Sequence, residues 1–173
     1  RLSDLGAKIV RTDWPGFDAS RARRAGLMLS EADAATAMAD DLAHRPDRFS
    51  PDLRAMLAYG AEAKAPRLVA AQATIREVRR LVRQSLATVD VLVLPTAPMP
   101  PFPFSDPAPP AQADFCAPAN FAGCPALSLP AGATPDGLPI GMQLVASAGR
   151  DFALIGLASD LAAARTAPDS APV

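Results

Sequence analysis

The sequence predicts an α/β fold in which a β-sheet is flanked by helices, and three observations point to it. Residues 89–94 are β-branched and apolar almost without interruption, which favours a strand covered on both faces at the centre of a sheet. Elsewhere apolar residues recur at the spacing of amphipathic helices, most clearly over residues 27–42 and 68–86. With 173 residues, half of them apolar, the chain is long enough for one core.

The first helix is expected to begin after Asp18 or Ser20, because either side chain can cap its free N–H groups. Its apolar stripe runs to about position 44, and we expect one continuous helix to that point. Upstream of it, a turn at Gly6 should lead into a short strand through residues 9–10. The Trp14-Pro15-Gly16 turn should then end that strand.

Two further helices follow in the sequence. Ser50 stands before Pro51, an arrangement typical of a capped helix start, and Gly60 is expected to close this short helix. The next helix, residues 68–86, carries an arginine row on the flank opposite its apolar face, namely Arg76, Arg79, Arg80 and Arg83. Such a row suits phosphate binding or a solvated helix face, and the lack of nearby aromatic residues favours the solvated face.

The strand at residues 89–94 ends at Pro95, which has no N–H to extend the sheet. Residues 97–113 are rich in proline and are expected to form a stiff surface loop. The spacing of Pro98 and Pro101 also matches the polyproline ligands of SH3-type modules. We favour the loop, because such ligands usually carry a flanking basic residue and none is present.

The last third of the chain predicts a strand pair and a helix. Residues 126–130 and 140–145 should pair in antiparallel fashion, and the loop between them contains Asp136-Gly137, which suits a turn with positive φ. A final helix should start at Asp151 and bury one apolar side. Residues 166–173 are small, polar and proline-containing, so we expect a frayed tail.

Composition excludes several classes of function. The net charge is only −1, so no long-range field favours nucleic acid or an anionic membrane. Apolar runs are far shorter than the roughly 20 residues of a transmembrane helix, and we expect a soluble, cytoplasmic protein. Cys116 and Cys124 have neither redox nor zinc spacing and are expected to be free thiols rather than a disulfide. Arg1 lacks a preceding initiator Met, and we interpret it as an internal position of a longer protein.

Three segments, in order, carry a resemblance to a known family: residues 90–96, 118–132 and 137–144. They resemble the C-terminal blocks of the amidase signature family, whose members use a Ser-Ser-Lys triad. The resemblance implies an α/β fold with a mixed β-sheet flanked by helices. It also implies that residues 1–173 are the C-terminal fragment of a single amidase domain.

Enzymes of that family hydrolyse amides with a nucleophilic serine, a bridging serine and a lysine base. The resemblance places no catalytic residue in this chain, which has no Ser-Ser or Gly-Gly pair and only Lys8 and Lys64, both expected at the surface. It implies a small-molecule amide substrate, the N-terminal part of the same domain as a partner, and a possible homodimer. Neither a cofactor nor a metal is expected, and the isolated chain should be inactive.

The resemblance leaves the parent activity open. Pro118-Ala119-Asn120 resembles the glutamine-using component of tRNA amidotransferases, whereas Pro130-Ala131-Gly132 suits stand-alone amidases equally well. Two alternatives from other classes are a non-catalytic module that presents its proline-rich loop and a hydrolase built on His44. Three ordered blocks outweigh both.

Five residues are candidates for the wall of the substrate pocket: Pro95, Thr96, Cys116, Asn120 and Gly123. A chain that leaves a sheet at a proline does so where ligand crevices open in α/β folds. Gly123, like Gly141, should permit close backbone approach. Asn120 suits either a ligand contact or hydrogen bonds to main-chain groups, and we favour the second. At Cys116 relatives commonly have threonine.

Two charged residues have a structural and a functional interpretation. Glu31 lies on an apolar stripe, which predicts a half-buried carboxylate paired with an arginine rather than a catalytic acid. His44, the only histidine, stands near a predicted helix C-terminus, where interaction with the helix dipole is its plain role.

Overall fold

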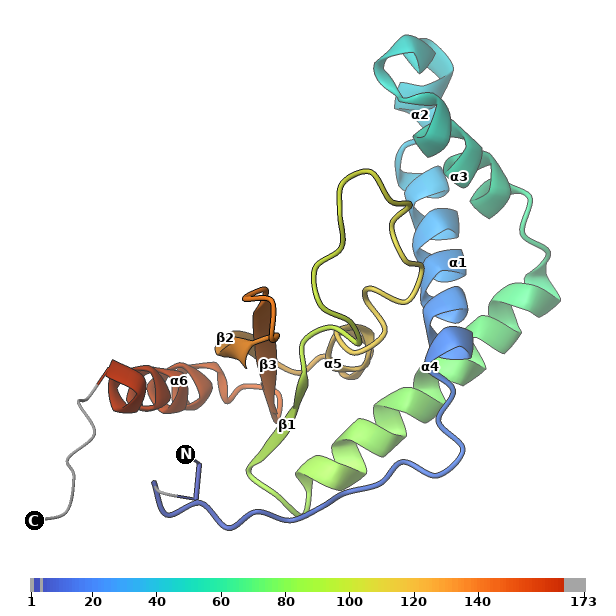
Figure 1. Cartoon of the computed structure of the whole chain (residues 1–173). Coiled ribbons are helices and arrows are strands. Elements are labelled where there is room, and N and C mark those ends of the chain that lie inside the picture. The colour runs from blue at the N-terminus through green and yellow to red at the C-terminus, as the bar shows by residue number, and fades with distance from the viewer. Residues whose placement is uncertain (1, 4, 167–173) are drawn as a thin grey trace, which may run out of the picture.

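The structure is a computed structural model that describes residues 2–3 and 5–166. It has a helical part and a small sheet joined through a short helix (Figure 1). In chain order the elements are α1 (Ala19–Ala37), α2 (Ala39–His44), η1 (Pro46–Arg48), α3 (Pro51–Ala61), α4 (Ala65–Leu86), β1 (Val91–Pro95), α5 (Ala117–Ala122), β2 (Ala126–Ala133), β3 (Pro139–Ala146) and α6 (Asp151–Thr166). The predicted combination of helices and a sheet is confirmed.

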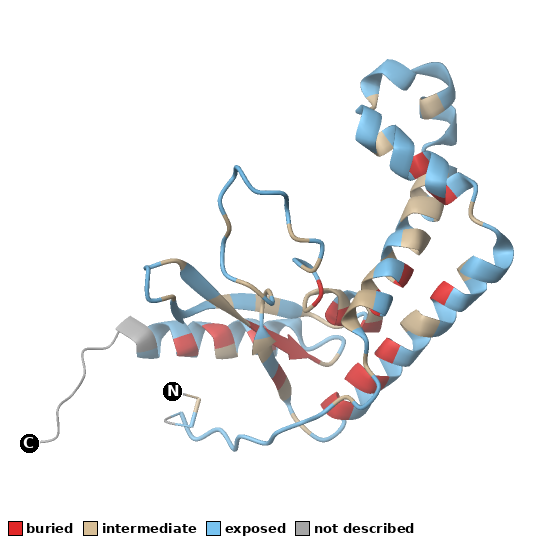
Figure 2. Cartoon of the chain, turned by 45° about the vertical axis from the view of Figure 1, so that its right-hand side comes forward, coloured by how far each residue is buried: buried red, intermediate tan, exposed pale blue. Residues whose placement is uncertain are grey.

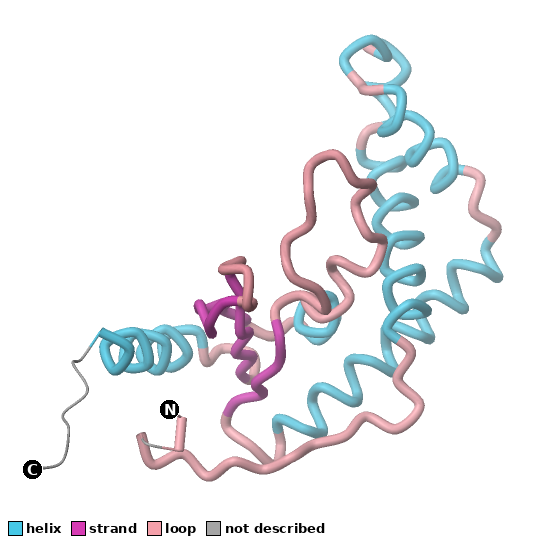
Figure 3. The backbone as a smooth tube through the Cα atoms, viewed as in Figure 1, coloured by secondary structure: helices cyan, strands magenta, loops and turns pink. Residues whose placement is uncertain are grey.

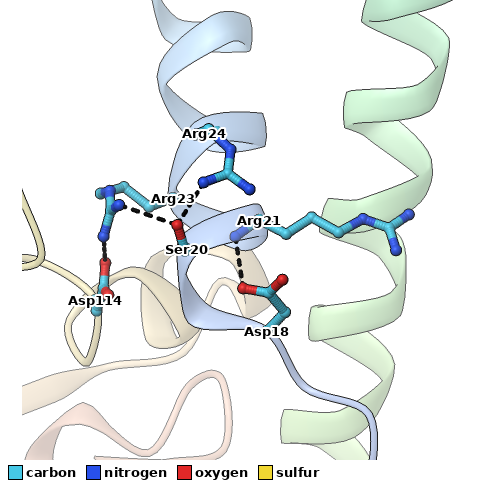
Figure 4. A network of polar contacts seen from close by, with 6 residues as sticks. All are labelled: Asp18, Ser20, Arg21, Arg23, Arg24 and Asp114. Carbon is cyan, nitrogen blue, oxygen red and sulfur yellow. Dashed lines mark hydrogen bonds and ion pairs between the residues drawn. The ribbon is translucent and has the colours of Figure 1, made fainter.

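The start of α1 follows from local chemistry, as the sequence predicts. The Phe17 N–H donates to the Trp14 carbonyl at 3.1 Å, and Gly16 has a φ of 77° in this turn. The Asp18 carboxylate then accepts from the backbone N–H of Arg21 at 2.9 Å and caps the helix (Figure 4). The Trp14 indole N–H donates to the Ser85 hydroxyl on α4 at 2.8 Å, which holds the N-terminal segment against that helix.

The strand expected at residues 9–10 does not form. Residues 7–14 have no regular secondary structure, and Ile9 and Val10 are 64% and 56% exposed. A strand requires a partner to satisfy its backbone groups, and the strands of the described sheet pair only with one another. The β-branched composition of this segment therefore has no sheet to join within the described chain.

The predicted continuous helix to position 44 is interrupted at Met38. There φ is −102° and ψ is 9°, so α1 ends at Ala37 and the short α2 begins anew. None of the residues of α2 is buried, whereas α1 packs against α3 and α4. The prediction was wrong because the apolar stripe continues past the point at which another element covers it.

Gly60 does not close α3, which runs to Ala61, although the Ser50 cap and the first-position Pro51 are confirmed. The Ser50 hydroxyl accepts from the Leu53 N–H at 3.2 Å. Gly60 is buried, and a Cβ there would lie 2.3 Å from the Glu31 carbonyl carbon on α1. Its lack of a side chain therefore allows the backbones of α1 and α3 to approach closely.

Helix α4 buries the predicted face. Its buried residues are Ala71, Val78, Leu81, Val82, Ser85 and Leu86. The arginine row on its other flank is exposed, yet two members also bond to α5: Arg79 Nε donates to the Phe121 carbonyl at 2.9 Å and Arg83 Nη2 to the Ala122 carbonyl at 3.4 Å. These cations satisfy carbonyls at the C-terminal end of α5, where positive charge is favourable.

The sheet has the strand order β1-β3-β2, with both pairs antiparallel (Figure 3). The predicted antiparallel pair of β2 and β3 is confirmed. Its turn contains Gly137 at a φ of 86°, and the Thr134 hydroxyl accepts from the Leu138 N–H at 2.9 Å. The central position expected for β1 is corrected, since β3 takes the centre. β1 is an edge strand, and its Val93 is 46% exposed.

Two apolar clusters hold these parts together (Figure 2). The first joins α1, α4, α5 and the sheet through Ala22, Val78, Val82, Leu86, Leu92, Ala119, Ala122 and Val145. The second packs α6 on the other side of the sheet through Leu144, Ala146, Leu154 and Leu161. The predicted apolar side of α6 is confirmed. The helix reaches Thr166, and the rest of the predicted frayed tail, residues 167–173, lies outside the described residues.

Over residues 2–3 and 5–166, none of the helices combines the length and apolarity that crossing a bilayer requires.

Candidate substrate-pocket wall

A cavity of about 890 Å³ lies between one end of the sheet and the loop that joins β1 to α5. Figure 1 shows this proline-rich loop rising between the sheet and α1. The sheet side contributes Pro95, Thr96, Ser128, Thr134, Pro139, Ile140 and Gly141. The loop side contributes Ala97, Pro98, Met99, Pro100, Pro101, Phe102, Phe104, Asp106, Ala108, Gln112 and Phe115. The cavity thus opens where β1 leaves the sheet.

A pair of hydroxyl groups lies at the sheet side of the cavity. Thr96 Oγ1 and Ser128 Oγ are 2.6 Å apart, and the Thr96 N–H donates to the Gly141 carbonyl at 3.0 Å. A Cβ on Gly141 would lie 2.9 Å from Thr96 Oγ1 and 3.1 Å from Ser128 Oγ. The predicted close approach at Gly141 is confirmed, because a side chain at that position would displace the pair.

Two side chains fix the far end of the loop against the sheet. The Cys116 thiol donates to the Thr96 carbonyl at 3.1 Å, so this candidate residue contacts the cavity wall from behind. Gln143, 4% exposed on β3, donates from Nε2 to the Phe115 carbonyl at 2.9 Å. Gln143 was missed as a positioning residue, although a polar side chain within the apolar strand 140–145 is a detectable signal.

An ion pair ties the same loop to α1. Arg23 Nη1 bonds to Asp114 Oδ1, and the two side chains are only 17% and 10% exposed. Arg23 also donates from Nη2 to the Ser20 hydroxyl at 3.2 Å, and Arg24 bonds to the same hydroxyl (Figure 4). Because the pair is shielded from water, its loss should be more costly than that of an exposed pair.

Replacing Asp114 with Asn should destabilise the chain by about 2 kcal/mol, because Arg23 would remain half-buried without its counterion. Urea unfolding measures this effect, and Asp13→Asn is the matched control, since the Arg11–Asp13 pair is exposed. Equal loss of stability in the two variants would show that the Arg23–Asp114 pair is not a specific tether.

The remaining candidates, Asn120 and Gly123, do not line the cavity. Asn120 is exposed, and over the described residues its side chain makes no hydrogen bond, so the favoured contact with main-chain groups is absent. Gly123 ends α5 at a φ of 66°, and no atom lies within 4 Å of a Cβ built there. Its requirement is therefore positive φ rather than close approach.

Glu31 and His44 lie away from the cavity. Glu31 is half-buried as predicted, in a groove of about 430 Å³ that Arg21, Arg24 and Arg67 also line. In the part of the chain that the structure describes it makes no ion pair, so the expected arginine partner is not found. His44 ends α2, as predicted, and its Nδ1 lies 2.9 Å from the Asp40 carbonyl oxygen.

The electrostatics of the cavity are one-sided. Asp106 lines it, and the lining includes no Lys, Arg or His among the described residues. Behind Thr134, the hydroxyl of that residue holds the pKa of the Asp136 carboxyl below its usual range. Cys116 and Cys124 are free thiols. Over residues 2–3 and 5–166, no three His, Cys, Asp or Glu side chains gather in a way that could hold a metal ion.

A family model described as Amidase matches residues 1–155. The chain belongs to the amidase family. Its amidase segments are also similar to curated relatives, which are A-type subunits of glutamyl-tRNA(Gln) amidotransferase. The relative from Prochlorococcus marinus (strain MIT 9303) is 34% identical over 185 residues, which cover 91% of this chain and 38% of the relative. The relative from Chlorobaculum parvum (strain DSM 263 / NCIMB 8327) is 31% identical over 98% of this chain and 41% of the relative.

Solved structures agree with this assignment. A crystal structure described as an amidase matches with a TM-score of 0.79 and 25% identity, over 94% of this chain and 39% of that chain. A bacterial aryl acylamidase of the amidase signature family matches in fold, with a TM-score of 0.68 and 18% identity, over 91% and 38%. The amidase resemblance and the α/β fold class are thus confirmed. The chain spans about two fifths of the length of the curated relatives.

Proposed function

We propose that this chain is the C-terminal part of an amidase that hydrolyses carboxamide C–N bonds through a serine acyl-enzyme. In this proposal it supplies pocket wall and core, whereas the upstream part of the same domain supplies the nucleophilic serine, the bridging serine and the lysine. The observation that carries the proposal is the cavity at Pro95 and Thr96, where β1 leaves the sheet in a chain of the amidase family.

The absence of catalytic residues from this chain is supported by the surroundings of its cavity hydroxyls. Ser128 bonds to Thr96, which is not a base, and neither Lys8 nor Lys64 lines the cavity. A serine needs a neighbouring base to become an efficient nucleophile. A buried lysine, neutral because desolvation lowers its pKa, is suited to this role and would come from upstream.

The open edge of β1 supports a partner from the same domain. Its outer backbone groups face no strand in the described chain, and Val93 is 46% exposed. Exposed strand edges in natural proteins are usually paired or covered. We propose that an upstream strand pairs here, that Asn120 and Gly123 then border the completed pocket with Cys116, and that a small amide is the substrate in the cytoplasm. A homodimer is compatible with this arrangement.

A second candidate is the glutamine amidohydrolase component of a tRNA amidotransferase. The observation in its favour is that curated relatives with 31% to 34% identity are named as A-type subunits of glutamyl-tRNA(Gln) amidotransferase. Ammonia release from glutamine that depends on added partner subunits would favour this candidate. A proline-rich interaction module is less well supported, because the loop lines the cavity instead of standing free.

The acyl-enzyme step is testable by trapping. With the complete enzyme that contains this chain, hexanamide and hydroxylamine should yield the hydroxamate at the expense of the carboxylic acid, because hydroxylamine competes with water for the acylated serine. Mass spectrometry separates the two products, and the mixture without enzyme is the control. Ammonia release accompanied only by the acid at saturating hydroxylamine would instead support direct attack by water.

A further inference from the structure

We propose that the cavity of this chain selects amides with an uncharged, apolar substituent, using the Thr96–Ser128 hydroxyl pair as its fixed polar anchor and discriminating against anionic substituents. The inference rests on the proposed function and specifies its substrate class. It favours simple alkyl or aryl amides over glutamine, whose α-carboxylate would require a cationic partner.

The size and lining of the cavity suit such a substituent. Its volume of about 890 Å³ falls within the range of small-molecule sites. Aromatic and aliphatic side chains of the loop and of β3 face it, namely Met99, Phe102, Phe104, Phe115 and Ile140. Phe104 is fully exposed, so a bound apolar group would remove its ring from water, which is favourable.

The hydroxyl pair supplies the polar contact. Of the two hydroxyl protons of Thr96 and Ser128, one lies in their mutual hydrogen bond, and the other remains available to a ligand oxygen. The Thr96 N–H is already bonded to Gly141, and its carbonyl accepts from Cys116. The hydroxyl pair is therefore the part of Thr96 that is free to orient a ligand, such as a carboxamide group.

The charges around the cavity act against an anion. Asp106 lines it, and the hydrogen bond from Thr134 favours the ionised form of Asp136 next to the rim. The nearest tethering cation on the loop, Arg23, is already paired with Asp114. A ligand carboxylate would lose water without gaining a positive partner from the described residues, which is unfavourable.

The test compares ligands of similar length on the complete enzyme. The isoleucine methyl signals report binding by NMR, since Ile140 lines the cavity and Ile155 lies on the exposed face of α6. Hexanamide should shift the Ile140 signal in a saturable way and bind at least about tenfold more tightly than the anion succinamate or than glutamine. Equal or tighter binding of succinamate or glutamine would overturn the inference.

Two variants test the anchor. Thr96→Val and Ser128→Ala should each weaken hexanamide binding about three- to tenfold and raise KM by a similar factor. Ser159→Ala on α6, whose hydroxyl bonds to the Ile155 carbonyl at 3.0 Å, should change neither. If either anchor variant unfolds, the ligand ranking of the unmodified enzyme still decides. Selective binding without turnover of any amide would reject the proposed function alone, whereas turnover with a preference for succinamate would reject this inference.

Discussion

The isolated chain should release no ammonia from any amide, whereas the same chain joined to its upstream amidase portion should hydrolyse amides. The expected difference is at least about a millionfold, because amide hydrolysis needs a nucleophile and a base that this chain does not supply. The upstream reading frame should contain a Gly-Ser-Ser-Gly-like run, preceded by a lysine in an apolar segment. Backbone N–H groups near that serine would stabilise the oxyanion.

Ammonia release from simple alkyl and aryl amides measures this prediction. The upstream portion alone is the matched control and should also be inactive, because it lacks the wall that Pro95 and Thr96 contribute. Turnover by the purified isolated chain that disappears when one of its own serines, such as Ser128, is changed to alanine would contradict the division of labour.

Helix starts and turns could be predicted because they depend on neighbouring residues. The Asp18 and Ser50 caps use side chains that reach a backbone N–H three residues ahead. Positive φ at Gly16 and Gly137 follows equally from local turn chemistry. Such features leave a signature in a few consecutive residues.

Features that depend on distant partners were predicted less well. Residues 9–10 have the composition of a strand but no strand to pair with, and β1 is displaced to an edge because β3 lies between it and β2. The helix break at Met38 likewise reflects where other elements stop covering α1. Sequence periodicity records which face is apolar, but not whether a partner covers it.

The cavity shows the same division. Pro95 and Thr96 were found from the segment that carries the family resemblance, and both line the cavity. The bond of Thr96 to Ser128 and the ion pair of Arg23 with Asp114 join residues 32 and 91 positions apart. No local pattern predicts such pairs, because they exist only once the sheet and α1 have placed the loop between them.

Gly60→Ala should be the most destabilising single substitution considered, with a loss of about 3 kcal/mol in the free energy of unfolding. The new Cβ would lie 2.3 Å from the Glu31 carbonyl carbon, 2.4 Å from its oxygen and 2.6 Å from the Ala32 nitrogen. These are backbone atoms within α1, so no side chain can rotate away. The helices would have to separate, which would expose Leu57, the buried leucine of α3.

Urea unfolding followed by the fluorescence of Trp14, the single tryptophan, measures this loss. Gly156→Ala is the matched control, since Gly156 lies in α6, is exposed and has no atom within 4 Å of a Cβ. That variant should be neutral or more stable by up to about 1 kcal/mol, because alanine favours the helix. If Gly60→Ala behaves like Gly156→Ala, close contact between the α1 and α3 backbones does not limit stability.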